Sequence, residues 1–196
     1  MKYIERKTKR IFDITVALFC IVVFSPLFLI CYLAIKFDDG GPALFSQERI
    51  GYKGKAFNIH KFRTMRCDAE ESGPQLYSDN DSRLTRAGAF LRKHHLDELP
   101  QLWNVLVGDM SFIGPRPERK YFIDKIMEHD SRYPQLYQLR PGVTSYATLY
   151  NGYTDTMEKM LRRLELDLYY VEHNSLWFDS KILFKTFSNI LFGKKF

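Results

Sequence analysis

The chain has 196 residues and a formal net charge of +6, and 45% of its residues are hydrophobic. This length suffices for one domain with a hydrophobic core, or for a smaller domain joined to a membrane element. The positive charge indicates an anionic partner, such as a nucleic acid, an anionic membrane surface or a phosphorylated substrate. The 3 cysteines lack the paired spacing of a disulfide framework, which favours a reduced cytosolic or membrane setting.

A long apolar run extends from Ile14 to Ile35. It is longer than the apolar core of a signal peptide, and no small-residue cleavage site follows it. A helix that spans a membrane needs about 20 apolar residues, which the run only just supplies. Pro26 lies near its middle and cannot donate to the carbonyl one turn back, so a helix must kink or break there. The Ser25 hydroxyl is well placed to satisfy a freed carbonyl.

Lysines and arginines flank the apolar run on both sides: Lys2, Arg6, Lys7, Lys9 and Arg10 before it, and Lys36, Arg49, Lys53, Lys55, Lys61 and Arg63 after it. A spanning helix would carry such an excess only on its cytoplasmic side. The flanks therefore favour a re-entrant helix that turns at Ser25-Pro26 and leaves on the face it entered, with a kinked single-pass anchor as the alternative. We predict a membrane-anchoring re-entrant helix over residues 1–38 and a cytosolic domain over residues 39–196.

A β-hairpin is predicted over residues 43–62, because two arms with rough apolar–polar alternation flank Gly51 and Gly54. The second arm leads into Lys61 and Arg63, which the alternation of a strand places on one face. Two cations at a strand end are suited to gripping a phosphate. A solvated charge pair at the edge of a sheet is an equally good interpretation of this fragment.

The segment from Phe90 to Glu118 is dense in charged groups between apolar residues. Within it, a core-facing helical stripe is predicted from the spacing of Leu96, Leu99, Trp103 and Leu106. Pro100 is tolerated only in the first turn of a helix, so this helix should begin just before it. Asp97 and Glu98 are therefore expected at or beside the helix N-terminus.

The helix start leaves two interpretations of Asp97 open. Free N–H groups and the helix dipole favour negative charge there by about 0.3–1 kcal/mol, so Asp97 should stay ionised, as a nucleophile or a metal ligand requires. The same helix start can receive a phosphate. A simple N-cap is the plainer alternative for a lone aspartate at this position.

Arginines on both sides of the Asp-Glu pair favour phosphate chemistry. Arg92 lies shortly before Asp97, and Arg116 lies between two prolines that hold its backbone. A guanidinium recognises phosphate through two parallel hydrogen bonds. Two carboxylates with two or more arginines suit phosphoryl transfer, in which catalysis is mainly positioning and charge neutralisation, usually with Mg²⁺.

The last third of the chain predicts helices of two kinds. Residues 155–170 carry a stripe typical of a core-facing helix: Met157, Met160, Leu161, Leu164 and Leu168. A second apolar stripe lies among aromatic and lysine side chains: Leu183, Phe184, Phe187, Ile190 and Leu191. This second pattern suits a helix in the lipid headgroup region, and a terminal helix packed on the core is the alternative.

Several short stretches carry a combined signature over nearly the whole chain: Phe45–Gly51, Lys61–Met65, Arg83–Gly88, Leu96–Leu102, Asn104–Leu106, Gly108–Ser111, Gly114–Glu118 and Arg140–Thr144, with the Ser25-Pro26 break. In these stretches the sequence resembles the bacterial sugar transferases, the small monotopic phosphoglycosyl transferases. The resemblance implies an α+β protein with a re-entrant helix-break-helix anchor. A β-hairpin and a mainly helical catalytic domain with membrane-surface helices would follow.

The resemblance implies transfer of a sugar-1-phosphate from a UDP-sugar to undecaprenyl phosphate with release of UMP, a first membrane step of surface glycan synthesis. Asp97 would form a covalent phosphosugar-aspartyl intermediate and hold Mg²⁺, and Glu98 would act in acid/base or positioning work. Phosphate or substrate binding is implied for Lys61, Arg63, Arg92, Gln101, Arg116 and Arg140. The catalytic domain would lie on the cytoplasmic face of the bacterial inner membrane, with the lipid bilayer as a partner.

Two other classes of protein explain less of the sequence. A membrane-tethered scaffold accounts for the charge and the amphipathic ends, but not for an Asp-Glu pair beside arginines. Nucleic-acid binding is suggested only by the net charge, because the cations match no nucleic-acid module. Within the family pattern, the pair His94-His95 and the stretch Ser145–Thr148 depart from the commonest residues. The second departure leaves the identity of the sugar open.

Overall fold

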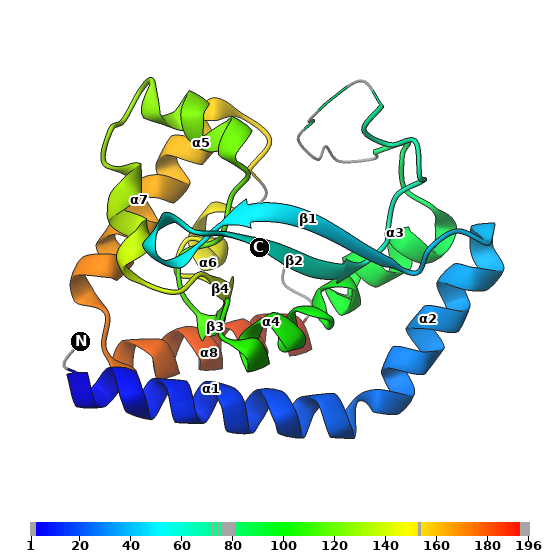
Figure 1. Cartoon of the computed structure of the whole chain (residues 1–196), viewed down its shortest axis with the longest axis horizontal. Coiled ribbons are helices and arrows are strands. Elements are labelled where there is room, and N and C mark those ends of the chain that lie inside the picture. The colour runs from blue at the N-terminus through cyan, green and yellow to red at the C-terminus, as the bar shows by residue number, and fades with distance from the viewer. Residues whose placement is uncertain (1–2, 72, 74, 76–80, 153, 193–196) are drawn as a thin grey trace.

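The computed structural model describes the whole chain except residues 1–2, 72, 74, 76–80, 153 and 193–196 (Figure 1). The α+β prediction is confirmed, because helices surround two small sheets. The elements in chain order are α1 (Tyr3–Val23), α2 (Ser25–Asp39), β1 (Leu44–Ile50), η1 (Tyr52–Gly54), β2 (Ala56–Phe62), α3 (Arg86–Lys93), η2 (Leu96–Glu98), α4 (Gln101–Val107), β3 (Ser111–Ile113), α5 (Lys120–Met127), η3 (Tyr133–Gln138), β4 (Gly142–Thr144), α6 (Thr148–Asn151), α7 (Met157–His173) and α8 (Leu176–Leu191).

The apolar run forms two helices that meet at a sharp bend. Helices α1 and α2 are bent by 62° at the break, and Pro26 occupies the first turn of α2. The Ser25 hydroxyl donates to the carbonyl of Val22 at 2.8 Å, the role expected for it beside a proline. Among the described residues, no single helix is long and apolar enough to cross a membrane, and this bent pair passes the same test of length and composition only when taken together.

The predicted β-hairpin is confirmed. Strands β1 and β2 pair antiparallel from Leu44 opposite Phe62 to Ile50 opposite Ala56. Lys53 in the connecting turn has a φ of 59°, a left-handed conformation that is unusual for a residue with a side chain. Side chains from α2, β2 and α3, including Ile35, Phe62 and Leu91, form one hydrophobic cluster. This cluster joins the bent helix pair to the rest of the fold.

A second, parallel pairing lies deeper in the fold and was not predicted. Ser111 pairs with Gly142 and Ile113 pairs with Thr144, so β3 and β4 bring the segment after α4 next to the segment after η3. Gly142 is required by this close approach, because a Cβ there would lie 2.2 Å from the backbone nitrogen of Gly114. The pairing fixes the position of residues 114–117, the Gly-Pro-Arg-Pro turn that follows β3.

The predicted core stripe of α7 is confirmed, because Met160, Leu164 and Leu168 are buried in a cluster with α5 and η3. The predicted stripe of the central helix is wrong at Trp103, which is 55% exposed. Helix α4 instead buries a different set of side chains: Gln101, Leu102, Asn104 and Val105. The helix is rotated because the amide of Asn104 hydrogen-bonds to the backbone of β2, a constraint that apolar spacing does not reveal.

Candidate active site

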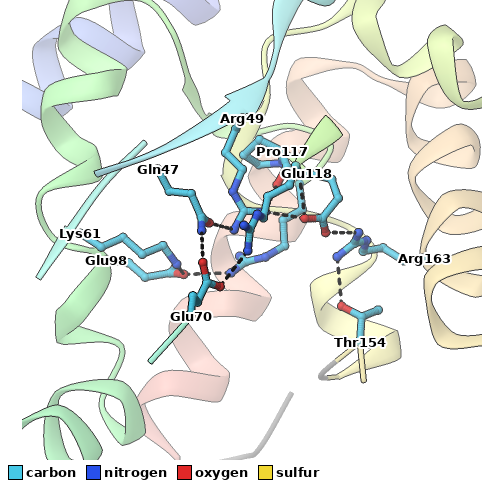
Figure 2. Close-up of polar contacts among 11 residues, drawn as sticks. Gln47, Arg49, Lys61, Glu70, Glu98, Pro117, Glu118, Thr154 and Arg163 are labelled. Atoms are coloured by element: carbon cyan, nitrogen blue, oxygen red, sulfur yellow. Dashed lines mark hydrogen bonds and ion pairs between the residues drawn. The ribbon is translucent and has the colours of Figure 1, made fainter. Parts of the chain in front are cut away.

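The carboxylate of Glu98 forms ion pairs with two cationic side chains. The Nζ of Lys61 donates to Glu98 Oε1 at 2.7 Å, and an Nη of Arg116 donates to the same oxygen at 3.0 Å. Figure 2 shows Lys61 and Glu98 facing each other beside the residues that hold the Arg116 turn. Three predicted site residues from β2, η2 and the Gly-Pro-Arg-Pro turn are thus brought together.

Backbone geometry places the Asp97-Glu98 pair against β2. His95 has a φ of 55°, and this left-handed residue turns the chain sharply between α3 and η2. Asn104 then fastens α4 to the strand, since its Nδ2 donates to Asn58 O at 2.7 Å and its Oδ1 accepts from His60 N at 3.0 Å. The predicted helix start near Pro100 is resolved into a short 3-10 turn, with α4 beginning one residue after the proline.

The Arg116 turn is held by buried charged groups that sequence reasoning missed. Arg116 N donates to Asp167 Oδ2 at 3.3 Å. Glu118 accepts from Arg49 at 2.5 Å and from Arg163 at 2.6 Å, and these ion pairs are visible in Figure 2. Arg163 and Asp167 lie one turn apart on the amphipathic helix α7, so a charged pair at helical spacing next to its apolar stripe was the available signal.

A described part of the acidic loop after β2 also reaches this cluster. Glu70 accepts from Arg119 at 2.7 Å and from the amide of Gln47 at 3.4 Å. Gln47 in turn accepts from Arg49 at 2.6 Å. The loop is therefore tied to the hairpin on one side and to the residue after Glu118 on the other, a link that its exposed composition did not predict.

The pKa values of the two carboxylates of the dyad, Asp97 and Glu98, are shifted in opposite directions. Burial acts to raise the pKa of Glu98, but the charges and hydrogen bonds of Lys61 and Arg116 outweigh it and hold that pKa well below its ordinary value. Burial raises the pKa of Asp97, and the charge of Glu98 adds to this effect, while Lys61 and Arg92 oppose it. Glu98 is therefore held in its ionised form by its two cationic partners, whereas the net effect of the surroundings of Asp97 is to raise its pKa.

The raised pKa of Asp97 runs opposite to the stabilisation of negative charge that is expected at a helix start. Asp97 is only 4% exposed. The longer helix α4 begins at Gln101, so its N-terminal dipole does not act directly on the aspartate. Asp97 also accepts no hydrogen bond from any described residue, so it is not a helix cap in this structure.

Arg92 and Gln101 are two further predicted site residues close to Asp97 and Glu98. Arg92 is close enough to Asp97 for its charge to lower the pKa of that carboxyl. Gln101 is buried at 1% exposure, and its Nε2 has no hydrogen-bond partner among the described residues. A buried donor without a partner costs stability, which marks Gln101 as a group available to an incoming acceptor.

Arg63 and Arg140 are bound elsewhere. Arg63 Nε donates to Pro42 O at 2.6 Å, and an Nη donates to Asp39 at 2.6 Å, so Arg63 fastens the end of α2 to the hairpin. Arg140 Nε donates to Gly108 O at 2.8 Å. Neither arginine contacts the dyad among the described residues, and their predicted roles in substrate binding receive no support from this geometry.

The dyad offers the ligands that Mg²⁺ prefers. No group of three or more histidine, cysteine, aspartate or glutamate side chains suited to a metal occurs in the described parts of the chain. Mg²⁺ does not require such a cage, because it is commonly held by one or two carboxylates together with substrate phosphates and water. The Asp97 carboxylate, which accepts no hydrogen bond from a described residue, fits that mode of binding.

The chain matches the model of the family described as bacterial sugar transferase over residues 4–193. It is 42% identical over 185 residues to UDP-N-acetylgalactosamine-undecaprenyl-phosphate N-acetylgalactosaminephosphotransferase of Aeromonas hydrophila, with 94% of this chain and 44% of the relative covered. It is 39% identical over 192 residues to UDP-glucose:undecaprenyl-phosphate glucose-1-phosphate transferase of Escherichia coli (strain K12), with 93% and 40% covered. The chain thus spans less than half the length of these two relatives.

A third relative has nearly the same length as this chain. It is the exopolysaccharide production protein PSS of Rhizobium leguminosarum bv. phaseoli, 42% identical over 195 residues, with 96% of this chain and 98% of the relative covered. With the match to the family model, these similarities define the class of protein. The chain belongs to the bacterial sugar transferase family, as the resemblance of its motifs predicts.

Proposed function

We propose that this protein transfers a sugar-1-phosphate from a UDP-sugar to undecaprenyl phosphate and releases UMP. The names of the relatives supply the class of reaction. The observation that carries the proposal is the buried Asp97 beside a Glu98 that is paired with Lys61 and Arg116. This arrangement supports the proposal, because a carboxylate beside fixed positive charge suits phosphoryl transfer between anions.

In the first step, an Asp97 carboxylate oxygen attacks the β-phosphorus of the UDP-sugar. The bond from this phosphorus to the bridging oxygen breaks, UMP leaves with the electron pair, and a phosphosugar-aspartyl anhydride forms. In the second step, a phosphate oxygen of undecaprenyl phosphate attacks the same phosphorus and frees the carboxylate. Bound Mg²⁺, held by Asp97 together with the substrate diphosphate, would neutralise phosphate charge.

Glu98 serves as a positioning residue in this scheme. Its pKa is held well below the ordinary value, so its carboxyl carries no proton to donate near neutral pH. It fixes the ammonium of Lys61 and the guanidinium of Arg116 beside Asp97. These two cations then stabilise the charge that develops on the diphosphate.

The bent helix pair is proposed to enter and leave the cytoplasmic membrane on its cytoplasmic face. Apolar side chains point outward along both of its helices, and Figure 1 shows α8 running beside α1. Helix α8 exposes Trp177, Phe184 and Phe187, with the tryptophan 70% exposed. This distribution favours the interfacial interpretation of α8, because a core-packing helix would bury these rings.

The reaction is tested by an assay of UMP release. Purified protein is incubated with UDP-sugars, Mg²⁺ and undecaprenyl phosphate, and wild type is compared with Asp97→Asn. Asp124→Asn is the matched control, since Asp124 is exposed on α5. We expect Mg²⁺-dependent release that only Asp97→Asn abolishes, and equal release from wild type and Asp97→Asn would refute the assignment.

The topology is tested by labelling. The natural cysteines are replaced by serine, and one cysteine is placed at residue 2 or at residue 38. A membrane-impermeant thiol reagent should label both positions from the cytoplasmic face. Labelling of the two positions from opposite faces would show a spanning helix instead.

A further inference from the structure

A small cavity of about 60 Å³ lies beside the first half of α1. Its lining includes four cations, Arg6, Lys9, Arg10 and Arg140. Asp13 is the one carboxylate among the described residues that line it, and neither member of the Asp-Glu dyad takes part. Because one water molecule needs about 10–15 Å³ by a comparable measure, the cavity has room for a group as large as a phosphate.

The three arginines of this cavity have no ion-pair partner among the described residues. Lys9 differs from them, because its Nζ lies 2.5 Å from Asp179 Oδ2. Arg10 donates to two carbonyl oxygens at the end of α4, at 2.6 and 2.9 Å. Arg140 donates through Nε to Gly108 O at 2.8 Å. These carbonyls hold two of the guanidinium groups in place but are neutral, so Asp13 is the one negative charge among the described lining residues, against four positive ones.

The Arg140 side chain is pre-arranged to receive an anion. Its guanidinium carbon lies 5.1 Å from the centre of the Tyr52 ring, which also lines the cavity. With Nε bound to Gly108, neither Nη atom hydrogen-bonds to a described residue. A guanidinium held in this way can offer its remaining N–H groups to phosphate oxygens with little further loss of entropy.

Exposed apolar side chains lie close to the cavity along α1, which agrees with the proposed membrane placement of this helix. Exposed Ile4 and Ile11 flank the cations along α1, and exposed Trp177 lies on the neighbouring helix α8. Apolar and aromatic side chains next to arginines are typical of a protein surface at the membrane interface. Anionic headgroups attract such cations by about 1 kcal/mol each.

We propose that this cavity is a second phosphate site, separate from the Asp-Glu dyad, which binds the phosphate group of an anionic membrane lipid. Arg140 and Arg10 contact the phosphate oxygens from the inside, and Arg6 closes the site from the exposed side. The proposal rests on the proposed membrane placement of α1. It gives Arg140 a phosphate partner that is not the sugar nucleotide.

The test is a titration of the full chain in neutral detergent micelles, followed by the thermal midpoint of unfolding. Three probes are compared: dioctanoyl-phosphatidylglycerol, inorganic phosphate and dioctanoylglycerol, which has the same chains and no phosphate. A ligand that binds the folded protein raises the midpoint with its concentration. We expect phosphatidylglycerol to raise it, inorganic phosphate to do so more weakly, and dioctanoylglycerol to have no effect.

Arg6→Gln is the informative variant, because Arg6 is exposed and its loss should leave the fold intact. Its apparent Kd for phosphatidylglycerol should rise about fivefold, the equivalent of one interfacial cation. Lys7→Gln removes the same charge from the same turn but does not line the cavity, so its Kd should stay within about twofold of wild type. Arg140→Lys keeps the positive charge but loses the parallel N–H donors of the guanidinium, so it should also weaken binding.

Equal affinities for wild type, Arg6→Gln and Arg140→Lys would overturn the proposal. So would equal stabilisation by the lipid without phosphate. Inorganic phosphate that binds as tightly as phosphatidylglycerol would show a free-anion site and overturn the lipid assignment. The titrations contain no UDP-sugar, so their failure would leave the UMP assay untouched, and loss of UMP release in Asp97→Asn would not bear on them.

Discussion

Replacing Glu118 by glutamine should strongly destabilise the fold. The pKa of Glu118 is held at about 2 against an ordinary value of 4.5, because Arg163 and Arg49 outweigh the effect of burial. At about 1.4 kcal/mol per pKa unit, this corresponds to about 3 kcal/mol for the ionised carboxylate. The side chain is only 8% exposed, so solvent screening reduces this figure little. Glu118→Gln would leave two arginines without their counter-charge.

The assay is thermal unfolding of the purified chain in detergent, compared with Glu48→Gln. Glu48 lies beside Arg49 on strand β1 and is exposed, so the same chemical change there should have almost no effect. For a chain of this length, a loss of about 3 kcal/mol lowers the midpoint by about 6–12 °C. A midpoint within about 1 °C of wild type, or of Glu48→Gln, would refute this reasoning.

The same carboxylate predicts a pH dependence of stability. Because its pKa is depressed in the folded state, its contribution is fully present above the unfolded value of 4.5 and is lost as the pH falls toward about 2. The difference in midpoint between wild type and Glu118→Gln should therefore shrink across this window. A difference that stays constant between about pH 5 and pH 2 would contradict an electrostatic origin.

Three further changes test separate parts of the structure. Lys61→Gln should lower kcat/KM for UMP release by about 100-fold, as loss of a charge-stabilising donor does, while the exposed Lys55→Gln should not. Gly88→Ala should destabilise the fold by at least about 1–3 kcal/mol in thermal unfolding, because its Cβ would lie 2.0 Å from the carbonyl oxygen of Thr64. Phe184→Ser should weaken flotation with liposomes without changing the melting midpoint, because the ring is exposed.

A different outcome would contradict each of these three predictions. Unchanged turnover in Lys61→Gln would remove that lysine from the candidate site. A stable Gly88→Ala protein would show that α3 can move away from the hairpin. Wild-type flotation of Phe184→Ser would favour a role for that ring away from the membrane.

Local signals in the sequence were sufficient for the hairpin, the bend at Pro26 and the core stripe of α7. In each case the determinant acts over a few residues: strand alternation with turn glycines, a missing backbone donor, or apolar side chains at helical spacing. Clustered charge and rigid prolines in the chain also predict that Glu98 and Arg116 share one charged site, and the structure brings these two residues into contact.

Long-range contacts decided what the sequence could not show. Trp103 was placed in the core by its spacing, but the hydrogen bonds of Asn104 to β2 turn that face of α4 outward. The sequence predicts either a phosphate grip or a solvated charge pair for Arg63, and its contacts with Asp39 depend on where α2 ends in space. The direction of the Asp97 pKa likewise depends on burial, which composition alone does not reveal.

The most direct test of the proposed mechanism is the intact mass of the protein after brief incubation with a UDP-sugar and Mg²⁺ in the absence of undecaprenyl phosphate. We expect wild type to gain the mass of one phosphosugar and to lose it when the lipid acceptor is added. Asp97→Asn should gain nothing. An adduct on Asp97→Asn, or a wild type that turns over in the complete reaction without ever forming an adduct, would contradict Asp97 as the covalent nucleophile.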